Sequence, residues 1–324
     1  MTLPEILRDI QSDLQRVERK LRGVGMSPVS LISAVYLHTL EAGGKRLRPA
    51  LVILAGRATG RVNERTYEVA AAIELIHLAS LIHDDVVDDA DLRRGRPTSN
   101  RIWGNRVSIL VADYLFSQAY TFLTHSLGTP LMYDLSQTVG QMVAGELSQL
   151  ENEGSLDLTQ EQYLEMIKNK TGALMAIACK LGARVSGGAP EQAEALSHYG
   201  LALGTAFQMA DDLLDLTAEE GQIGKPVGND IRNGRLTLPL IYTLHRLEGP
   251  AREEFIHLLS KEELTSEDFL TVRRLAQECG GVDYAQGKAR EFTEQAKAFL
   301  HSLPPTKARD TLSRLADYIL TRRR

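Results

Sequence analysis

Residues 61–94 read RVNERTYEVAAAIELIHLASLIHDDVVDDADLRR, thirty-four consecutive positions without a glycine or a proline. Apolar side chains in this stretch, among them Val69, Ile73 and Ile76, recur at the three- and four-residue spacing of a helix face. Good helix formers occupy most of the positions between them. The stretch therefore predicts one long helix, about 40 Å in length at about 1.5 Å per residue.

The same helical pattern continues along the chain, with breaks rich in glycine and proline. It covers the ranges 106–127, 131–152, 159–183, 191–216 and 234–248. No alternating pattern or turn signal indicates a β-hairpin, and no internal repeat or low-complexity linker divides the chain. We therefore expect an all-α protein of roughly ten helices, forming a single domain over 1–324, with a long loop at 217–233.

Composition excludes several classes of protein. The chain has 324 residues and a net charge of −5, so it is not a typical nucleic-acid binder. Its two cysteines, Cys179 and Cys279, are too few for a disulfide scaffold. No stretch approaches the roughly 18 apolar residues of a membrane span, and the N-terminus lacks the apolar core of a secretory signal. We expect a cytoplasmic protein with no stable membrane insertion and no nucleic-acid partner.

An acidic cluster ends the first stretch. Asp84, Asp85 and Asp88 form a D-D-x-x-D pattern, and on a helix Asp84 and Asp88 share one face. Like charges at that spacing cost a few tenths of a kcal/mol per pair, and a bound divalent cation removes the cost. A solvated helix end is the ordinary alternative for a single cluster of this kind.

A second D-D-x-x-D pattern makes the metal interpretation stronger. Asp211, Asp212 and Asp215 also follow an apolar helical run, and lysines do not alternate with them. Because both clusters offer only oxygen ligands, they suit Mg²⁺ rather than zinc. We interpret them as two sets of metal ligands at the lips of a cavity between helices.

Basic residues lie near glycines and near the acidic clusters, where they could hold phosphate oxygens. Each of them alone could be an ordinary surface charge. Together with two magnesium-type clusters, they favour a diphosphate site. They are Lys45, Arg46, Arg48, Arg93, Arg94, Lys168, Lys170, Lys225 and Arg235.

With these motifs in place, the sequence resembles the trans-isoprenyl (polyprenyl) diphosphate synthases, specifically the long-chain bacterial type that includes octaprenyl diphosphate synthase. The matching stretches occur in family order and cover most of 40–245. They are 43–49 (GGKRLRP), 73–98, 170–172 (KTG), 204–215 (GTAFQMADDLLD) and 224–242.

The resemblance implies a helical bundle around a deep central cavity, usually in a homodimer. It implies Mg²⁺ as the cofactor, with three ions per active site when substrate is bound. Asp84, Asp85 and Asp88 would bind ions that carry the allylic diphosphate. Asp211, Asp212 and Asp215 would hold a further ion. An allylic primer such as farnesyl diphosphate would then condense with successive isopentenyl diphosphate units.

The resemblance also assigns roles to individual polar residues. Those matching the isopentenyl diphosphate site are Lys45, Arg48, His77 and Arg94. Those matching the allylic diphosphate site are Arg93, Lys170, Lys225 and Arg235. Thr171 and Gln208 match polar groups that face the developing carbocation, so with Lys170 and the aspartates they are the catalytic candidates. On chemistry alone His77 could equally be a core histidine. Two departures from the family occur, Arg235 in place of Lys and Asn229 in place of Asp.

Product length is predicted from the helix that precedes Asp84. Ile76, Ala79 and Ser80 lie one or two turns before this aspartate. Members that make short products resemble one another in carrying a bulky aromatic residue four or five positions before it. Ala79 and Ser80 are small, so we expect a long product of C30–C50, with C40 favoured by the resemblance. Supply of quinone side chains is the role that the family implies.

Several alternatives stay open at this point. A short-chain synthase making farnesyl or geranylgeranyl diphosphate, or the catalytic subunit of a heteromeric synthase, would use the same motifs. A terpene cyclase is chemically close but needs no second diphosphate pocket. His83 and Asp84 could mimic an HD-type metal phosphohydrolase, an interpretation that leaves the second acidic cluster without a role.

Overall fold

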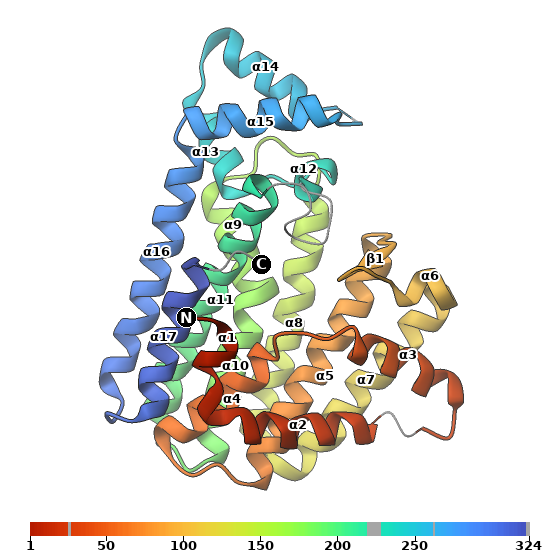
Figure 1. Ribbon diagram of the computed structural model, residues 1–324, viewed down its shortest axis with the longest axis vertical. Coiled ribbons are helices and arrows are strands. Elements are labelled where there is room, and N and C mark those ends of the chain that lie inside the picture. The colour runs from red at the N-terminus through yellow and green to blue at the C-terminus, as the bar shows by residue number, and fades with distance from the viewer. Residues whose placement is uncertain (25–26, 219–227, 262, 322–324) are drawn as a thin grey trace. The chain divides into compact units, whose positions relative to one another are not determined.

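The structure, a computed structural model, describes residues 1–24, 27–218, 228–261 and 263–321 (Figure 1). The first helices are α1 (Leu3–Ile6), α2 (Gln11–Val24), α3 (Ser30–Glu41), α4 (Leu47–Thr59), α5 (Glu64–Val87), α6 (Ser99–Trp103), α7 (Asn105–Ser126), α8 (Thr129–Glu151) and α9 (Gln160–Ile167). The later ones are α10 (Ala173–Val185), α11 (Pro190–Thr217), α12 (Asn229–Arg232), α13 (Leu238–Arg246), α14 (Gly249–Leu259), α15 (Ser266–Glu278), α16 (Gly281–Phe299) and α17 (Lys307–Thr321).

Shorter elements complete the described chain. Two strands, β1 (Leu92–Arg93) and β2 (Arg96–Pro97), form a small antiparallel hairpin. Two 3₁₀ turns are η1 (Arg8–Ile10) and η3 (Leu300–Ser302), and η2 (Lys168–Gly172) is a single π-helical turn. Almost all regular structure in the described residues is therefore helical, which confirms the all-α prediction.

The predicted ranges and the observed helices agree for the long elements and differ for the short ones. α5, α7, α8 and α11 fall where the sequence pattern placed them. The range 159–183 is divided into α9 and α10 by η2, and α12 lies inside the predicted loop. The described residues contain seventeen α-helices rather than about ten. Three of them, α1, α6 and α12, have only four or five residues, too few to carry a periodic pattern.

Contacts between Cα atoms group the chain into two compact units. The first contains the described residues of 1–136, 175–200 and 299–315, and the second contains those of 137–174, 201–298 and 316–321. Several helices, α8 and α11 among them, contribute residues to both.

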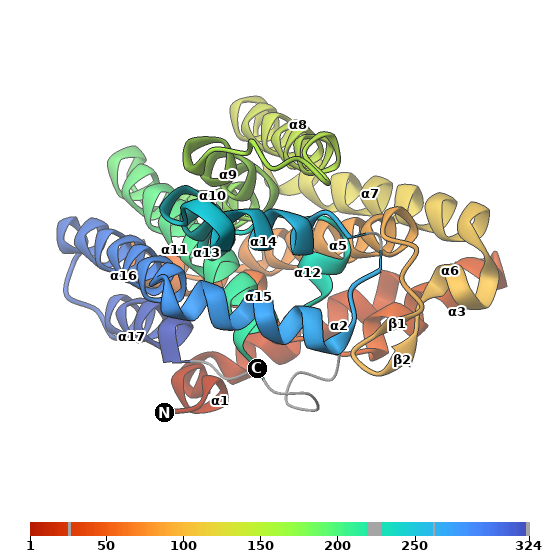
Figure 2. The ribbon, with the colours of Figure 1, turned by 90° about the horizontal axis from the view of Figure 1, so that it is seen from above.

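In the first unit, α5 is the central element. Asn63 caps its N-terminus by accepting hydrogen bonds from the backbone N–H groups of Arg65 and Thr66. α7 runs beside α5, as Figures 1 and 2 both show, and α2 and α4 pack against it as well. Because neighbours cover most of its circumference, buried side chains occur on nearly every face of α5. This explains why the apolar residues of α5 are not confined to one stripe along the helix.

The hairpin that follows α5 was missed in the sequence. Arg94 and Gly95, the two residues between β1 and β2, have positive φ angles of 53° and 75°. Two positive φ angles define the tight turn that matches the twist of a hairpin. Strands of two residues are too short to show alternation, so the glycine was the one available signal.

The second unit has its own hydrophobic core. Its members come from α9, the end of α11, and the helices α12 to α16, and they include Tyr163, Met209, Leu238, Phe255 and Val272. Tyr163 and Phe255 are completely or almost completely buried. This core fixes the C-terminal end of α11, where the second acidic cluster lies.

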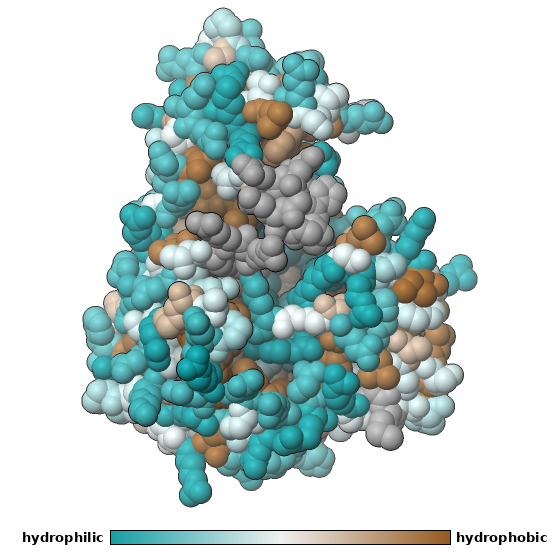
Figure 3. Space-filling model, viewed as in Figure 1, coloured by the Kyte–Doolittle hydropathy of each residue, from teal (hydrophilic) through white to brown (hydrophobic). Residues whose placement is uncertain are grey.

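Hydrophobic side chains on the face shown in Figure 3 occur as separate patches among hydrophilic ones. In the part of the chain that the structure describes, none of the helices has the length and apolar character needed to cross a membrane.

Candidate active site

The first acidic cluster lies at the C-terminal end of α5. Asp84 and Asp85 belong to its last turn, and Asp88 follows as the C-cap residue. Asp84 and Asp88 are half-buried, whereas Asp85 is 5% exposed. The Nε of Arg93, on strand β1, donates to Oδ1 of Asp85 at 2.6 Å. The hairpin thus places Arg93, a predicted diphosphate ligand, next to the carboxylates at the end of α5.

Predicted isopentenyl diphosphate ligands gather in the first unit. Lys45 and Arg48 flank the N-terminus of α4, His77 lies two turns before Asp84 on α5, and Arg94 occupies the hairpin turn. Burial lowers the pKa of His77 well below its usual value, and the charges of Arg48 and Arg94 lower it further. His77 is therefore a neutral side chain close to cations, which can donate to a phosphate oxygen without adding charge.

The second acidic cluster is held by a chain of hydrogen bonds. The hydroxyl of Thr171 donates to Oε1 of Gln208 at 2.8 Å, and Nε2 of Gln208 donates to Oδ1 of Asp212 at 2.8 Å. The hydroxyl of Tyr163 donates to the other oxygen of Asp212 at 2.5 Å. Three residues predicted separately from the sequence are therefore directly connected, and Tyr163 is an additional member of the site.

The neighbouring carboxylates perturb one another. The pKa of Asp212 is raised to about 6, because burial and the charges of Asp211 and Asp215, which raise it, outweigh the hydrogen bonds from Tyr163 and Gln208, which lower it. Asp215 accepts hydrogen bonds from the backbone N–H groups of Asn229 and Asp230, at 3.2 and 2.9 Å, which caps the short helix α12. Burial and the charges of Asp212 and Asp215 raise the pKa of Asp230 well above its usual value.

Lys170 lies in the π-helical turn η2, an irregularity that is frequent at functional sites. Its Nζ is 2.7 Å from Oε2 of Glu146 and donates to Oε1 of Gln149 at 3.0 Å. Gly145 brings α8 close to this turn, because a Cβ there would lie 2.6 Å from the backbone nitrogen of Lys170. Two side chains of α8 and one close backbone approach therefore fix the position of the lysine.

Of the two remaining candidates for the allylic diphosphate site, the structure describes Arg235 but not Lys225. Nε of Arg235 donates to Oε1 of Glu153 at 2.9 Å, and its guanidinium is 13% exposed. Lys225 lies outside the described residues.

The predicted chain-length residues lie on α5. Ile76 and Ala79 are fully buried, and Ser80 is half-buried and donates its hydroxyl to the carbonyl of His77 at 2.9 Å. The spacing to Asp84 is as predicted, because α5 continues unbroken through all of these positions.

Four residues of the site are additional to those that the sequence predicts. Tyr163, Glu146 and Gln149 contact predicted residues from other helices, and one sequence without a structure contains no signal for such contacts. Asp230 does carry a sequence signal, since it is an acid in the glycine-rich segment between Lys225 and Arg235.

The donor chemistry fits a hard divalent cation. Each cluster offers carboxylate oxygens without sulfur or imidazole, which is the ligand set of Mg²⁺. Among the residues that the structure describes, no three His, Cys, Asp or Glu side chains are already gathered at metal-binding distance. Asp85 and Asp212 instead contact Arg93 and Tyr163.

The raised pKa of Asp212 predicts a pH-dependent stability. An unfolded aspartate has a pKa of about 3.9, whereas that of Asp212 is about 6 in the folded protein. The folded state therefore binds this proton more tightly, so the stabilisation is present below about pH 4 and is lost as pH rises through about 6. In EDTA, the melting temperature should fall by a few degrees between pH 5 and 7.5.

Calorimetry of the wild type and of Asp212→Asn across this range tests the assignment. The variant cannot titrate at this position, so its melting temperature should depend less on pH. Superimposable profiles for the two proteins would assign the pH dependence to other groups.

Comparison with known proteins agrees with this geometry. The family model for polyprenyl synthetase matches residues 29–275. The octaprenyl diphosphate synthase of Escherichia coli is 35% identical over 324 residues, covering the whole of both chains. A short chain isoprenyl diphosphate synthase of Methanothermobacter thermautotrophicus is 39% identical over 303 residues, covering 92% of each chain.

Two further similar proteins are a component of a heptaprenyl diphosphate synthase and a polyprenyl synthase of known crystal structure. Heptaprenyl diphosphate synthase component 2 of Bacillus subtilis is 34% identical over 310 residues, which is 96% of this chain and 88% of that protein. A crystal structure of a polyprenyl synthase from Caulobacter crescentus, complexed with calcium and isoprenyl diphosphate, is similar with a TM-score of 0.94 and 37% identity. It covers 100% of this chain and 98% of its own. The chain therefore belongs to the polyprenyl synthetase family and is a trans-polyprenyl diphosphate synthase.

Proposed function

We propose that the enzyme elongates an allylic diphosphate, such as farnesyl diphosphate, with isopentenyl diphosphate to an all-trans C40 product, within the range C30–C50. The observation that carries this proposal is the pair of small residues, Ala79 and Ser80, that precede Asp84 on the continuous helix α5. Position 76 lies about 12 Å along the helix from Asp84 at about 1.5 Å per residue. With no bulky side chain at 79 or 80, a growing tail would not be stopped within the first two turns.

The two acidic clusters are proposed to bind Mg²⁺, with three ions per active site when substrate is present. Support comes from their oxygen-only ligands and from the calcium in the Caulobacter crescentus structure. Bound there, Mg²⁺ would act as a Lewis acid on the leaving diphosphate. Asp84, Asp85 and Asp88 would carry the ions of the allylic substrate, and Asp211, Asp212 and Asp215 a further ion.

The remaining site residues are proposed to orient substrates and to protect the carbocation. Lys45, Arg48, His77 and Arg94 would hold isopentenyl diphosphate. Arg93, Lys170, Lys225 and Arg235 would hold the allylic diphosphate. Arg93, Lys170 and Arg235 contact carboxylates in the structure, so each would exchange a protein carboxylate for a phosphate oxygen.

Thr171 and Gln208 are proposed to face the allylic cation. Their mutual hydrogen bond fixes their orientation before substrate arrives, and preorganised dipoles stabilise developing charge without rearrangement. The double bond of isopentenyl diphosphate would attack the cation. The proton released afterwards would leave with the diphosphate, so the protein need not supply a general base.

We further propose that both compact units form one synthase domain and that the protein is a homodimer. The family model extends across segments of both units, which supports the first point. Val143 and Leu147, one turn apart on α8, are each more than half exposed, which supports a partner surface on this helix. The pathway would be the supply of quinone side chains.

A short-chain product is the second candidate, because the relative from Methanothermobacter thermautotrophicus is a short chain synthase. A heteromeric enzyme is the third, because the relative from Bacillus subtilis is a component of its synthase.

One assay separates these candidates. The purified chain is incubated with Mg²⁺, farnesyl diphosphate and labelled isopentenyl diphosphate, and the dephosphorylated products are sized. We expect incorporation to need both prenyl substrates, to stop in EDTA, and to end between C30 and C50. Products of C15–C20 would establish the short-chain function. A chain that is inactive alone, with intact secondary structure, would contradict the homodimer and favour a missing subunit.

A further inference from the structure

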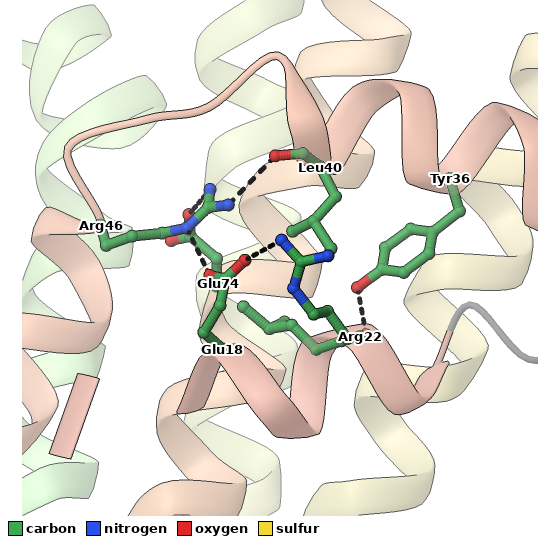
Figure 4. Close-up of polar contacts among 7 residues, drawn as sticks. Glu18, Arg22, Tyr36, Leu40, Arg46 and Glu74 are labelled. Carbon is green, nitrogen blue, oxygen red and sulfur yellow. Dashed lines mark hydrogen bonds and ion pairs between the residues drawn. The ribbon is translucent and has the colours of Figure 1, made fainter. Parts of the chain in front are cut away.

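Arg46 lies between the proposed substrate ligands Lys45 and Arg48 but points away from solvent. Its backbone is left-handed, with φ of 47°, a conformation that is uncommon for a residue with a long side chain. Its guanidinium makes three contacts, shown in Figure 4. Nε donates to Glu18 at 3.2 Å, Nη1 to Oε1 of Glu74 at 3.0 Å, and Nη2 to the carbonyl of Leu40 at 3.1 Å.

Glu74 is the buried partner in this network. It lies one turn before His77 on α5, and its side chain is only 3% exposed. Burial raises its pKa, while the positive charges of Arg46, Arg48 and Arg94 lower it. Its second oxygen, Oε2, is buried and has no hydrogen-bond partner among the described residues. Such a carboxylate is costly unless cations surround it.

The loop itself depends on the same guanidinium. Gly44 lies against two arginines, because a Cβ at this position would be 3.0 Å from Nη1 of Arg94 and 3.2 Å from Nη1 of Arg46. Arg46 is therefore packed beneath the loop that carries Lys45, and it connects this loop to α2, α3 and α5 through Glu18, Leu40 and Glu74. A lysine could not replace it, since an ammonium lacks the planar fork that reaches three acceptors in fixed directions.

We propose that Arg46 and Glu74 are positioning residues for isopentenyl diphosphate: their ion pair holds the 43–46 loop and the start of α4 against α5, so that Lys45, Arg48, His77 and Arg94 converge on one diphosphate. This inference rests on the proposed function of those four residues. Neither Arg46 nor Glu74 is proposed to touch substrate. They act by fixing geometry, to which binding and catalysis are sensitive at the scale of 1 Å.

The test compares KM for the two prenyl substrates in Arg46→Lys and Glu74→Gln. We expect KM for isopentenyl diphosphate to rise about tenfold in both, corresponding to about 1.4 kcal/mol, while kcat and KM for the allylic diphosphate stay within about twofold. Because the two residues act as one unit, the double variant should resemble the single ones rather than multiply their effects.

Two control variants separate positioning from general destabilisation. Asp13→Asn removes the charge of another buried acid of the same unit, whose ion-pair partner Arg57 lies at 2.6 Å and is 39% exposed, and should lower the melting temperature without changing either KM. Glu18→Gln removes the more exposed contact of Arg46, with Glu18 31% exposed, and should have a smaller effect on KM than Glu74→Gln.

Arg48→Lys distinguishes failure of the inference from failure of the proposed function. If this variant leaves KM for isopentenyl diphosphate unchanged, the proposed site is wrong and the positioning role is overturned with it. If Arg48→Lys raises KM but Arg46→Lys and Glu74→Gln do not, the positioning role alone is overturned. A lower KM in Glu74→Gln would overturn it too, because the carboxylate would then only repel substrate.

Discussion

Replacing Asp84 with asparagine is expected to lower kcat about a thousandfold, with folding unaffected. Neutralising one carboxylate of the first cluster removes part of the ligand set proposed for Mg²⁺, and Lewis-acid assistance to a leaving diphosphate is worth several kcal/mol. A loss of about 4 kcal/mol corresponds to a factor of about 10³. Asp84 is half-buried on the last turn of α5, so asparagine replaces it without a large change in volume.

Asp89→Asn is the matched control for this prediction. Asp89 belongs to the same acidic run but lies outside the D-D-x-x-D pattern, is exposed, and has a φ of 47°, which asparagine tolerates. It should retain activity within about twofold. Steady-state rates at several Mg²⁺ concentrations measure both variants. Equal losses in the two would indicate that the net charge of the segment matters, rather than ligation by Asp84.

Ala79→Tyr is expected to shorten the product from C40 to C15–C20. The aromatic ring would lie five residues before Asp84, about 7.5 Å along the helix axis at about 1.5 Å per residue, where it would stop the growing tail. Sizing of labelled products by chromatography measures the change. The rate of the first condensation should change much less than the final length, because the diphosphate ligands are untouched.

Two companion variants keep this prediction testable. Ala79 is fully buried, so tyrosine could destabilise α5, and Ser80→Phe places an aromatic ring at a half-buried neighbour instead. Ala79→Ser leaves the position small and should not alter product length. If both variants, Ala79→Tyr and Ser80→Phe, fold and still make the C40 product, the prediction that the growing prenyl tail runs along α5 is wrong.

The long helices and the family could be predicted from the sequence because their signals are local. The run without glycine or proline predicted α5, and the order of motifs predicted a synthase. Membership of this family excludes the HD-type phosphohydrolase alternative. His83 instead contacts Asp113 of α7, with Nε2 3.6 Å from Oδ1, and its ring lies beside Phe116.

What the sequence could not predict depends on contacts between distant segments. No sequence neighbour of Asp212 indicates that Tyr163 donates a hydrogen bond to it. Likewise, the sequence does not distinguish Arg46, which contacts Glu74, from the cations Lys45 and Arg48 near it. Turns of two residues and helices of four lack the length over which periodicity can be read. The deep cavity and the dimer remain predictions.

Gly145 restricts how this enzyme can evolve. Any side chain there would collide with the backbone of Lys170, so the collision would displace the π-helical turn rather than a flexible side chain. A mutational library selected for synthase activity should therefore keep glycine at this position as strictly as it keeps the aspartates. Purifying selection can therefore act on a position that contributes no side chain at all as strongly as on a residue that binds substrate.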